Sequence, residues 1–181
     1  MTAELTQNTE NHLTLTERLR VRRSSTILLV DTSGSMASDC EPGLPKIQAL
    51  RNVVAEISGS PTVFWFADAF GQCDKDSIPD PTGCTYAAPA LQHLRDIGYC
   101  RLVLITDGDI FDKERTLEAA KGMNIKCMYI GAGVRPAFLD KLANMCGGYA
   151  TTNDLTQQKL LTEKIQLLLN AGEPARGAFE L

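Results

Sequence analysis

The amino-acid sequence predicts an α/β fold: a Rossmann-like, doubly wound and mostly parallel sheet flanked by helices on both faces. Three observations predict it. Short apolar runs of strand length alternate with segments of helical periodicity along almost the whole chain, a pattern typical of a parallel sheet with helical crossovers. The apolar runs are continuous rather than alternating, as expected of strands covered on both faces. A length of 181 residues with 44% hydrophobic residues suits one domain with a substantial core.

The predicted strands follow the apolar runs. The first is residues 25–31, STILLVD, where β-branched and apolar residues run up to a single aspartate. Three similar runs and one weaker run are also predicted as strands: residues 61–67, 101–107, 124–133 and 149–152.

The predicted helices lie between these strands. Residues 45–58 place Ile47, Leu50 and Val54 at helical spacing, with Pro45 where a helix can start. Four further helices are predicted over residues 86–97, 112–123, 135–148 and 155–172. Residues 13–25 fit either a short helix or a lead-in strand. The domain division that we expect is an N-terminal tail and lead-in over residues 1–24, a folded domain over residues 25–170 and a C-terminal tail over residues 171–181.

Composition narrows the possible functions. A formal net charge of -4 argues against general nucleic-acid binding, which relies on a basic face. No apolar run approaches the ~18 residues of a membrane helix, and the N-terminus lacks the apolar core of a signal peptide. We therefore expect a cytoplasmic protein that binds neither nucleic acid nor membrane. The six cysteines are then reduced thiols, and a zinc site from Cys40, Cys73 and Cys84 would have a spacing that matches no common ligand pattern.

Oxygen-bearing side chains follow two of the predicted strands. Asp31 and Asp107 each end an apolar run, so both are expected at the carboxyl edge of the parallel sheet, where ligands of such folds bind. Ser33 and Ser35 follow Asp31, and Thr85 lies on a separate loop where a helix begins. Two carboxylates and three hydroxyls form an all-oxygen set that suits a small, hard divalent cation such as Mg²⁺.

These residues carry a resemblance to a known family. DTSGS at 31–35, GCT at 83–85 and LITDGD at 104–109 resemble the metal-ion-dependent adhesion site (MIDAS) of von Willebrand factor type A (vWA) domains. The family pattern is DxSxS, then a threonine, then an aspartate at the end of a later strand. The resemblance covers residue 25 to about residue 169.

The resemblance implies a function as well as a fold. Residue by residue, the metal ligands would be Asp31, Ser33, Ser35, Thr85 and Asp107, holding Mg²⁺, with Mn²⁺ or Ca²⁺ as substitutes. A partner protein's Asp or Glu would complete the shell of the ion, so that the domain binds proteins and is not an enzyme. Relatives inside cells also suggest an adaptor role toward an AAA+ ATPase or a multiprotein complex.

The sequence departs from the family pattern in three places. Cys84 stands where the family commonly has a second glycine before the threonine, and residues 70–83 leave room for only a short antiparallel edge strand. Asp109 and Asp112 add acid beside Asp107, either as exposed acids at the start of a helix or in the outer shell of the metal.

Two other functions stay open. A Mg²⁺-dependent phosphohydrolase could use Asp31 as nucleophile, but it would normally need a second acid where Ser33 stands and a positioned lysine. A metal-free scaffold would need no ion at all, and DTSGS would then be a polar turn.

Overall fold

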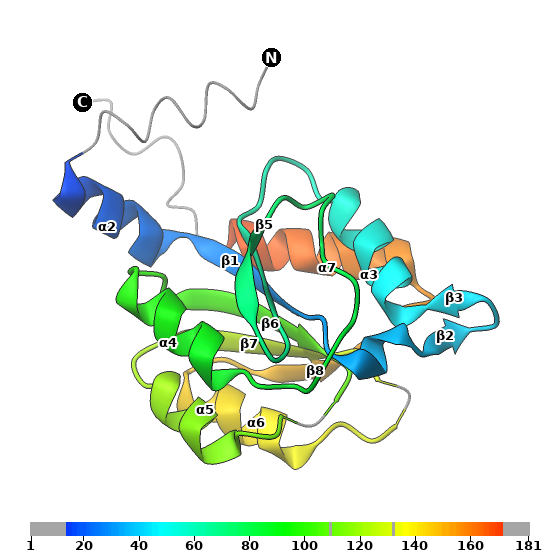
Figure 1. The fold of residues 1–181 in the computed structure, drawn as a ribbon. Helices are drawn as coiled ribbons and strands as arrows, with labels where there is room; N and C mark the ends of the chain where they lie inside the picture. Colours follow the sequence, from blue (N-terminus) through cyan, green and yellow to red (C-terminus); the bar gives the residue numbers. More distant parts are fainter. Residues whose placement is uncertain (1–13, 109, 132, 172–181) are drawn as a thin grey trace.

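The predicted α/β sheet is present. The computed structural model describes residues 14–108, 110–131 and 133–171. They form a six-stranded sheet in the order β5-β4-β1-β6-β7-β8 (Figure 1). The strands are β1 (Thr26–Asp31), β4 (Val63–Phe66), β5 (Phe70–Cys73), β6 (Arg101–Thr106), β7 (Asn124–Tyr129) and β8 (Ala150–Thr152). Only β5 runs antiparallel to its neighbour, which confirms the short antiparallel edge strand.

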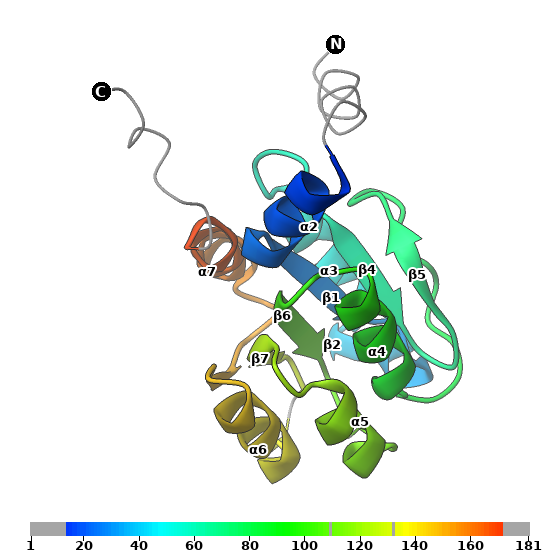
Figure 2. The same cartoon turned by 90° about the vertical axis from the view of Figure 1, so that its left-hand side faces the viewer.

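Helices cover both faces of the sheet (Figure 2). One face packs on α4 (Ala88–Asp96), α5 (Lys113–Ala119) and α6 (Ala137–Met145), the other on α3 (Lys46–Ala55) and α7 (Gln158–Asn170). Successive residues of β1 point to opposite faces, so Leu29 belongs to the first core and Leu28 to the second, both fully buried. This double burial is why the strands read as continuous apolar runs.

Residues 15–24 of the segment before the sheet form a helix, which decides between the helix and the lead-in strand that the sequence left open. Helix α2 (Leu15–Ser24) starts with a capping box: the Thr14 side chain accepts from the Glu17 amide, and the Glu17 carboxylate accepts from the Thr14 amide. Arg22 fastens α2 to the domain, because its guanidinium donates to the Ile97 carbonyl and lies over the Tyr99 ring. Of the predicted tails over residues 1–24 and 171–181, residues 1–13 and 172–181 lie outside the described residues.

One part of the observed fold was not predicted. Between β1 and α3 the chain forms a 3₁₀ turn, η1 (Gly34–Ala37), and a small hairpin of β2 (Asp39–Glu41) and β3 (Leu44–Pro45). Gly43 allows the tight turn with a φ of 78°. The hairpin returns the chain to the carboxyl edge of the sheet, where the Lys46 amide donates to the Ser38 carbonyl at 3.0 Å.

The length and hydropathy of the helices in the described ranges can be compared with those of a membrane-spanning helix. None of them is both long and apolar enough to span a bilayer.

Candidate functional site

The candidate site lies at the carboxyl edge of β1, in the middle of the sheet. Strand β1 sits between β4 and β6, the place where the strand order reverses and where ligands of doubly wound sheets bind. Asp31 is its last residue. The parallel register pairs Val30 with Ile105, so Thr106, the last residue of β6, comes next to Asp31.

Asp31 is a buried carboxylate with both oxygens engaged. It is 0% exposed. One oxygen accepts from the Ser33 amide at 2.8 Å, and the other accepts from the Thr106 hydroxyl at 2.5 Å. Burial nevertheless raises the pKa of Asp31 to about 6, and the negative charge of Asp107 acts in the same direction. The ionised form of Asp31 therefore carries a free-energy cost, which a nearby cation would lower.

A chain of side-chain contacts joins the first loop to Asp107. The Ser33 and Ser35 hydroxyl oxygens are 3.2 Å apart, and the Ser35 hydroxyl donates to Asp107 Oδ1 at 2.7 Å. Strands β1 and β6, with the residues that follow them, thus bring together four of the five predicted residues: Asp31, Ser33, Ser35 and Asp107.

The fifth residue, Thr85, is tied to the group through its backbone. The loop before it runs beside the first loop, since the Gly34 amide donates to the Gly83 carbonyl at 3.0 Å and the Thr82 amide to the Thr32 carbonyl at 2.8 Å. The Thr85 carbonyl accepts from the Phe111 amide at 3.0 Å. The Thr85 residue is 4% exposed, and its hydroxyl has no hydrogen bond to the described residues.

Gly83 allows this close approach. Its φ is 64°, and a Cβ at this position would lie 1.8 Å from Asp68 Oδ2. The same Asp68 carboxylate accepts from the Cys84 amide at 2.9 Å. The loop therefore needs a glycine at position 83, whereas position 84 holds an exposed thiol.

Lys46 is a residue of the site that the sequence analysis missed. Its ammonium donates to Asp107 Oδ2 at 2.7 Å, and the side chains of Lys46 and Asp107 are only 13% and 1% exposed. Lys46 is the first residue of α3, where the helix dipole disfavours a positive charge. That unfavourable position was the signal in the sequence that could have pointed to an acidic partner.

Asp112 does not lie free beside the site. Its two oxygens accept from the amides of Ala87 and Ala88, both at 3.1 Å, and from the Thr116 hydroxyl at 2.9 Å. Asp112 thus anchors the start of α4. Asp109, the other acid considered for the outer shell, lies outside the described residues.

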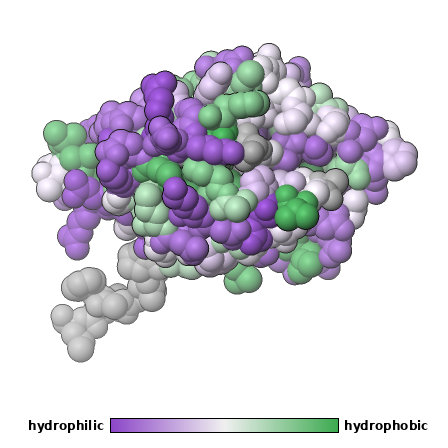
Figure 3. Space-filling view, turned by 90° about the horizontal axis from the view of Figure 1, so that it is seen from below, coloured by the Kyte–Doolittle hydropathy of each residue, from purple (hydrophilic) through white to green (hydrophobic). Residues whose placement is uncertain are grey.

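Exposed aromatic side chains border the site. Tyr86 directly follows Thr85 and is 40% exposed, and Phe111 is 68% exposed. Their ring centroids are 6.2 Å apart. We call this pair the aromatic rim. The face of the molecule seen from below Figure 1 carries hydrophilic and apolar areas side by side (Figure 3).

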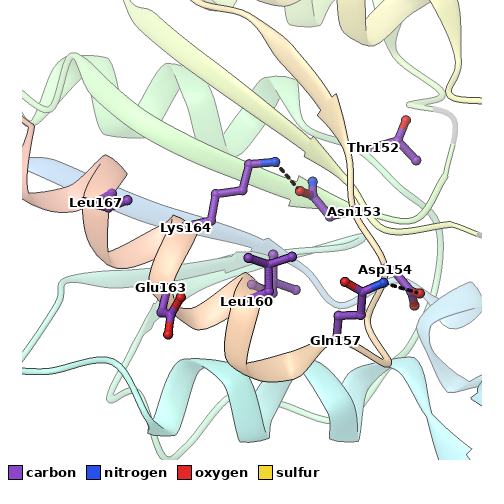
Figure 4. Close-up of a pocket in the computed structure, with 9 residues that line it drawn as sticks. Thr152, Asn153, Asp154, Gln157, Leu160, Glu163, Lys164 and Leu167 are labelled. Carbon is purple, nitrogen blue, oxygen red and sulfur yellow. Dashed lines mark hydrogen bonds between the residues drawn. The ribbon is translucent and has the colours of Figure 1, made fainter.

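Two hollows lie on the α7 side of this edge. A pocket of about 360 Å³ adjoins the site and includes Lys46, Gly131 and Asp154 in its lining. A groove of about 490 Å³ runs along α7, where Leu160 and Leu167 are exposed and Lys164 donates to the Asn153 side chain (Figure 4).

The donor set fits a small, hard divalent cation. Two carboxylates and two serine hydroxyls are linked by contacts, and the loop that carries Thr85 runs beside them. Oxygen ligands are what Mg²⁺ prefers. No group of three or more His, Cys, Asp or Glu side chains that could hold a metal occurs among the described residues. This includes Cys40, Cys73 and Cys84, which gives the zinc alternative no support. An ion at the site would depend on hydroxyl oxygens.

Solved structures share the fold of this chain, but no comparison assigns the chain to a family. No protein-family model matches the sequence, and neither does any curated protein. Among solved structures, a von Willebrand factor type A protein from Catenulispora acidiphila aligns with a TM-score of 0.60 at 14% identity, over 80% of this chain and 42% of that one. Proximal thread matrix protein 1 of the mussel byssus aligns with a TM-score of 0.57 at 18% identity, over 81% and 45%.

A third solved structure matches over almost its whole length. It is an aerotolerance-related membrane protein from Bacteroides fragilis, solved with multiple mutations to serines, with a TM-score of 0.54 at 13% identity, over 81% of this chain and 98% of that one. The chain spans less than half the length of the Catenulispora and mussel proteins. At these identities the likeness shows a shared α/β fold, that of a vWA domain.

Proposed function

We propose that this chain is a protein-interaction domain that binds Mg²⁺ and, through the ion, an acidic side chain of a partner protein. The proposed ligands are Asp31, Ser33, Ser35, Thr85 and Asp107, with the two carboxylates holding the ion directly or through waters and with Mn²⁺ or Ca²⁺ as substitutes for Mg²⁺. The observation that carries the proposal is the convergence of two buried carboxylates with the Ser33–Ser35 hydroxyl pair at the switch point of the sheet.

The chemistry of the site supports a role in binding. Mg²⁺ takes about six oxygen ligands and keeps waters where the protein supplies none. Two carboxylates only balance the charge of the ion and leave several of its coordination positions to hydroxyls and waters, so an Asp or Glu from another protein could replace a water. The aromatic rim would give that partner apolar contact area next to the charged contact. An AAA+ ATPase or another multiprotein complex is the class of partner that the resemblance suggests.

The first test isolates the hydroxyl of Thr85. Thr85→Val removes a hydroxyl that has no hydrogen bond within the described residues, so the free energy of unfolding should change by less than about 1 kcal/mol. Titration calorimetry with MgCl₂ and MnCl₂ should show binding to the wild type and a loss of at least about tenfold in Thr85→Val. Thr82→Val, the same change at an exposed position of the same loop, is the matched control. Equal metal affinity in all three proteins would refute the ligand assignment.

The second test concerns the partner. The immobilised domain should retain proteins from a native lysate in MgCl₂ and release them in EDTA, whereas Thr85→Val should retain them poorly in both. Retention that is indifferent to EDTA and to Thr85→Val would favour the metal-free scaffold.

A phosphohydrolase is the second candidate, because Lys46 supplies the positioned lysine that such an enzyme needs. The burial of Asp31 weighs against it: a nucleophile must reach its substrate, and both Asp31 oxygens already accept hydrogen bonds at 0% exposure. We expect no hydrolysis of p-nitrophenyl phosphate in MgCl₂. If the wild type hydrolysed this substrate and Asp31→Ala did not, the enzymatic function would take the place of the binding function.

A further inference from the structure

The ammonium of Lys46 occupies one side of the candidate site. It donates to Asp107 Oδ2 at 2.7 Å and lies 3.5 Å from the Ser35 carbonyl oxygen. The other Asp107 oxygen accepts from the Ser35 hydroxyl. Both oxygens of this carboxylate are therefore used within the protein, and its charge is balanced by a cation from its own chain.

This arrangement sets two cations in competition for one carboxylate. A divalent ion bound directly to Asp107 would stand within a few ångströms of the Lys46 ammonium, and like charges in a buried site repel strongly. The side chain of Asp107 is 1% exposed, so water screens this repulsion poorly. The ion and the ammonium cannot both keep close contact with Asp107.

The structure offers the displaced ammonium a place to go. Lys46 also lines the adjoining pocket of about 360 Å³, together with Asn153 and Asp154. Hydrogen bonds from the Thr156 hydroxyl and amide lower the pKa of Asp154, so this side of the pocket carries a negative charge. The flexible lysine stem can turn toward the pocket without moving α3.

We propose that Lys46 is a tethered counter-ion of the metal site: it holds Asp107 when no metal is bound, and a divalent ion must displace it to bind. The inference rests on the proposed metal-binding function. It assigns Lys46 a positioning role that sets metal affinity, so the domain exchanges an internal cation for an external one instead of filling an empty site.

The test compares lysines at the two ends of one helix. Lys46→Met keeps the length of the side chain and removes its charge, whereas Lys46→Arg keeps the charge. Lys75→Met is the matched control, because the Lys75 ammonium donates to the Ala55 and Ile57 carbonyls at the other end of α3. MgCl₂ alone and MnCl₂ alone are the probes, read by titration calorimetry, with thermal unfolding in EDTA and in metal as the second readout.

Lys46→Met should bind Mg²⁺ about tenfold more tightly than the wild type, within the usual range of coupling between two binding events. In EDTA it should unfold at a lower temperature, because Asp107 loses its partner, and metal should raise its unfolding temperature more than that of the wild type. Lys46→Arg should stay close to the wild type. Lys75→Met should lose the same stability with and without metal.

The outcomes separate the two proposals. If the wild type binds metal and Lys46→Met binds it with equal or lower affinity, the counter-ion role is overturned and the metal-binding function stands. Binding by Lys46→Met but not by the wild type supports that role in its strongest form. If neither protein binds either metal while circular dichroism shows both folded, the counter-ion role and the metal-binding function fail together. Should Lys46→Met not fold in EDTA, Lys46→Gln is measured in its place and judged by the same criteria.

Discussion

Asp31 is an ionisable side chain that is fully buried, and its hydrogen bonds only partly offset the cost of burying its charge. The Ser33 amide and the Thr106 hydroxyl both donate to it, which favours the charged form, yet burial outweighs them and raises the pKa to about 6. A group whose pKa is higher in the folded than in the unfolded protein stabilises the fold at low pH. That contribution is complete below about pH 3.8 and is lost as the pH rises through about 6.

Asp31→Asn should therefore stabilise the metal-free protein at pH 8. The neutral amide removes the cost of an ionised buried carboxylate, which is about 2–3 kcal/mol for a pKa rise of this size, and the Thr106 hydroxyl can turn to accept from the amide. Urea unfolding in EDTA should show this gain at pH 8 and a much smaller one at pH 4.5. With MgCl₂ at pH 8 the advantage should shrink or reverse, because only the wild type gains from metal binding. A difference between the two proteins that is independent of pH would contradict this account of Asp31.

The residues of the site differ in how far the sequence could predict them. Asp31, Ser33, Ser35 and Asp107 lie within short motifs at strand ends, and the contacts of the fold bring them together. Thr106 lies inside LITDGD, but nothing in that motif gave it a role, and Lys46 lies in no motif. Thr106 reaches Asp31 only through the register of β1 and β6, and Lys46 reaches Asp107 only because an unpredicted hairpin turns the chain back. Tertiary placement decides both.

At the scale of the elements, the strands were easier to predict than the helix ends. Burial on both faces makes the central strands apolar throughout, which leaves a strong signal in the sequence. The helices α3 to α7 begin without a side-chain cap hydrogen bond, and their first and last residues carried little signal. The predicted helix over residues 45–58 is thus observed as Lys46–Ala55.

The start of α4 gets its anchor from another element instead of its own first residues. Asp112, next to α5, accepts from two amides of α4, and α4 begins just after Thr85 and the aromatic rim. Asp112→Ala should lower the free energy of unfolding by about 1–2 kcal/mol, as loss of a helix cap does. Its effect on Mg²⁺ affinity should stay below about threefold, since a charge outside the site is largely screened.

Glu114→Ala is the matched control for Asp112→Ala. It removes the same charge from the exposed first turn of α5 and should leave stability nearly unchanged. Chemical unfolding and calorimetry would check both variants. If Asp112→Ala kept full stability but lost metal binding, Asp112 would belong to the outer shell of the ion and not to the anchor of α4.

For the whole molecule, charge and surface point to the same edge of the sheet. A chain with a formal net charge of -4 repels acidic partners at long range, so recognition of an Asp or Glu needs a local positive charge. A bound Mg²⁺ with open coordination positions would supply it at the proposed site, with the displaced Lys46 ammonium in the adjoining pocket. The aromatic rim is the exposed apolar surface next to this point, and it has little to do for the fold, since Phe111 is 68% exposed.

The aromatic rim should therefore matter for binding and not for stability. Tyr86→Ser combined with Phe111→Ser should change the free energy of unfolding by less than about 1 kcal/mol, as surface substitutions do, and should leave calorimetric Mg²⁺ affinity intact. The proteins that the wild type retains from a lysate in MgCl₂ and releases in EDTA should be lost from this variant, because apolar contact area at the centre of an interface carries much of its affinity. Leu160→Ser combined with Leu167→Ser removes comparable exposed apolar surface from the groove along α7 and serves as control. If only the Leu160→Ser, Leu167→Ser variant lost retention, the partner would bind at the groove along α7 and not at the aromatic rim. If both variants retained the partner, the metal ion alone would account for the binding.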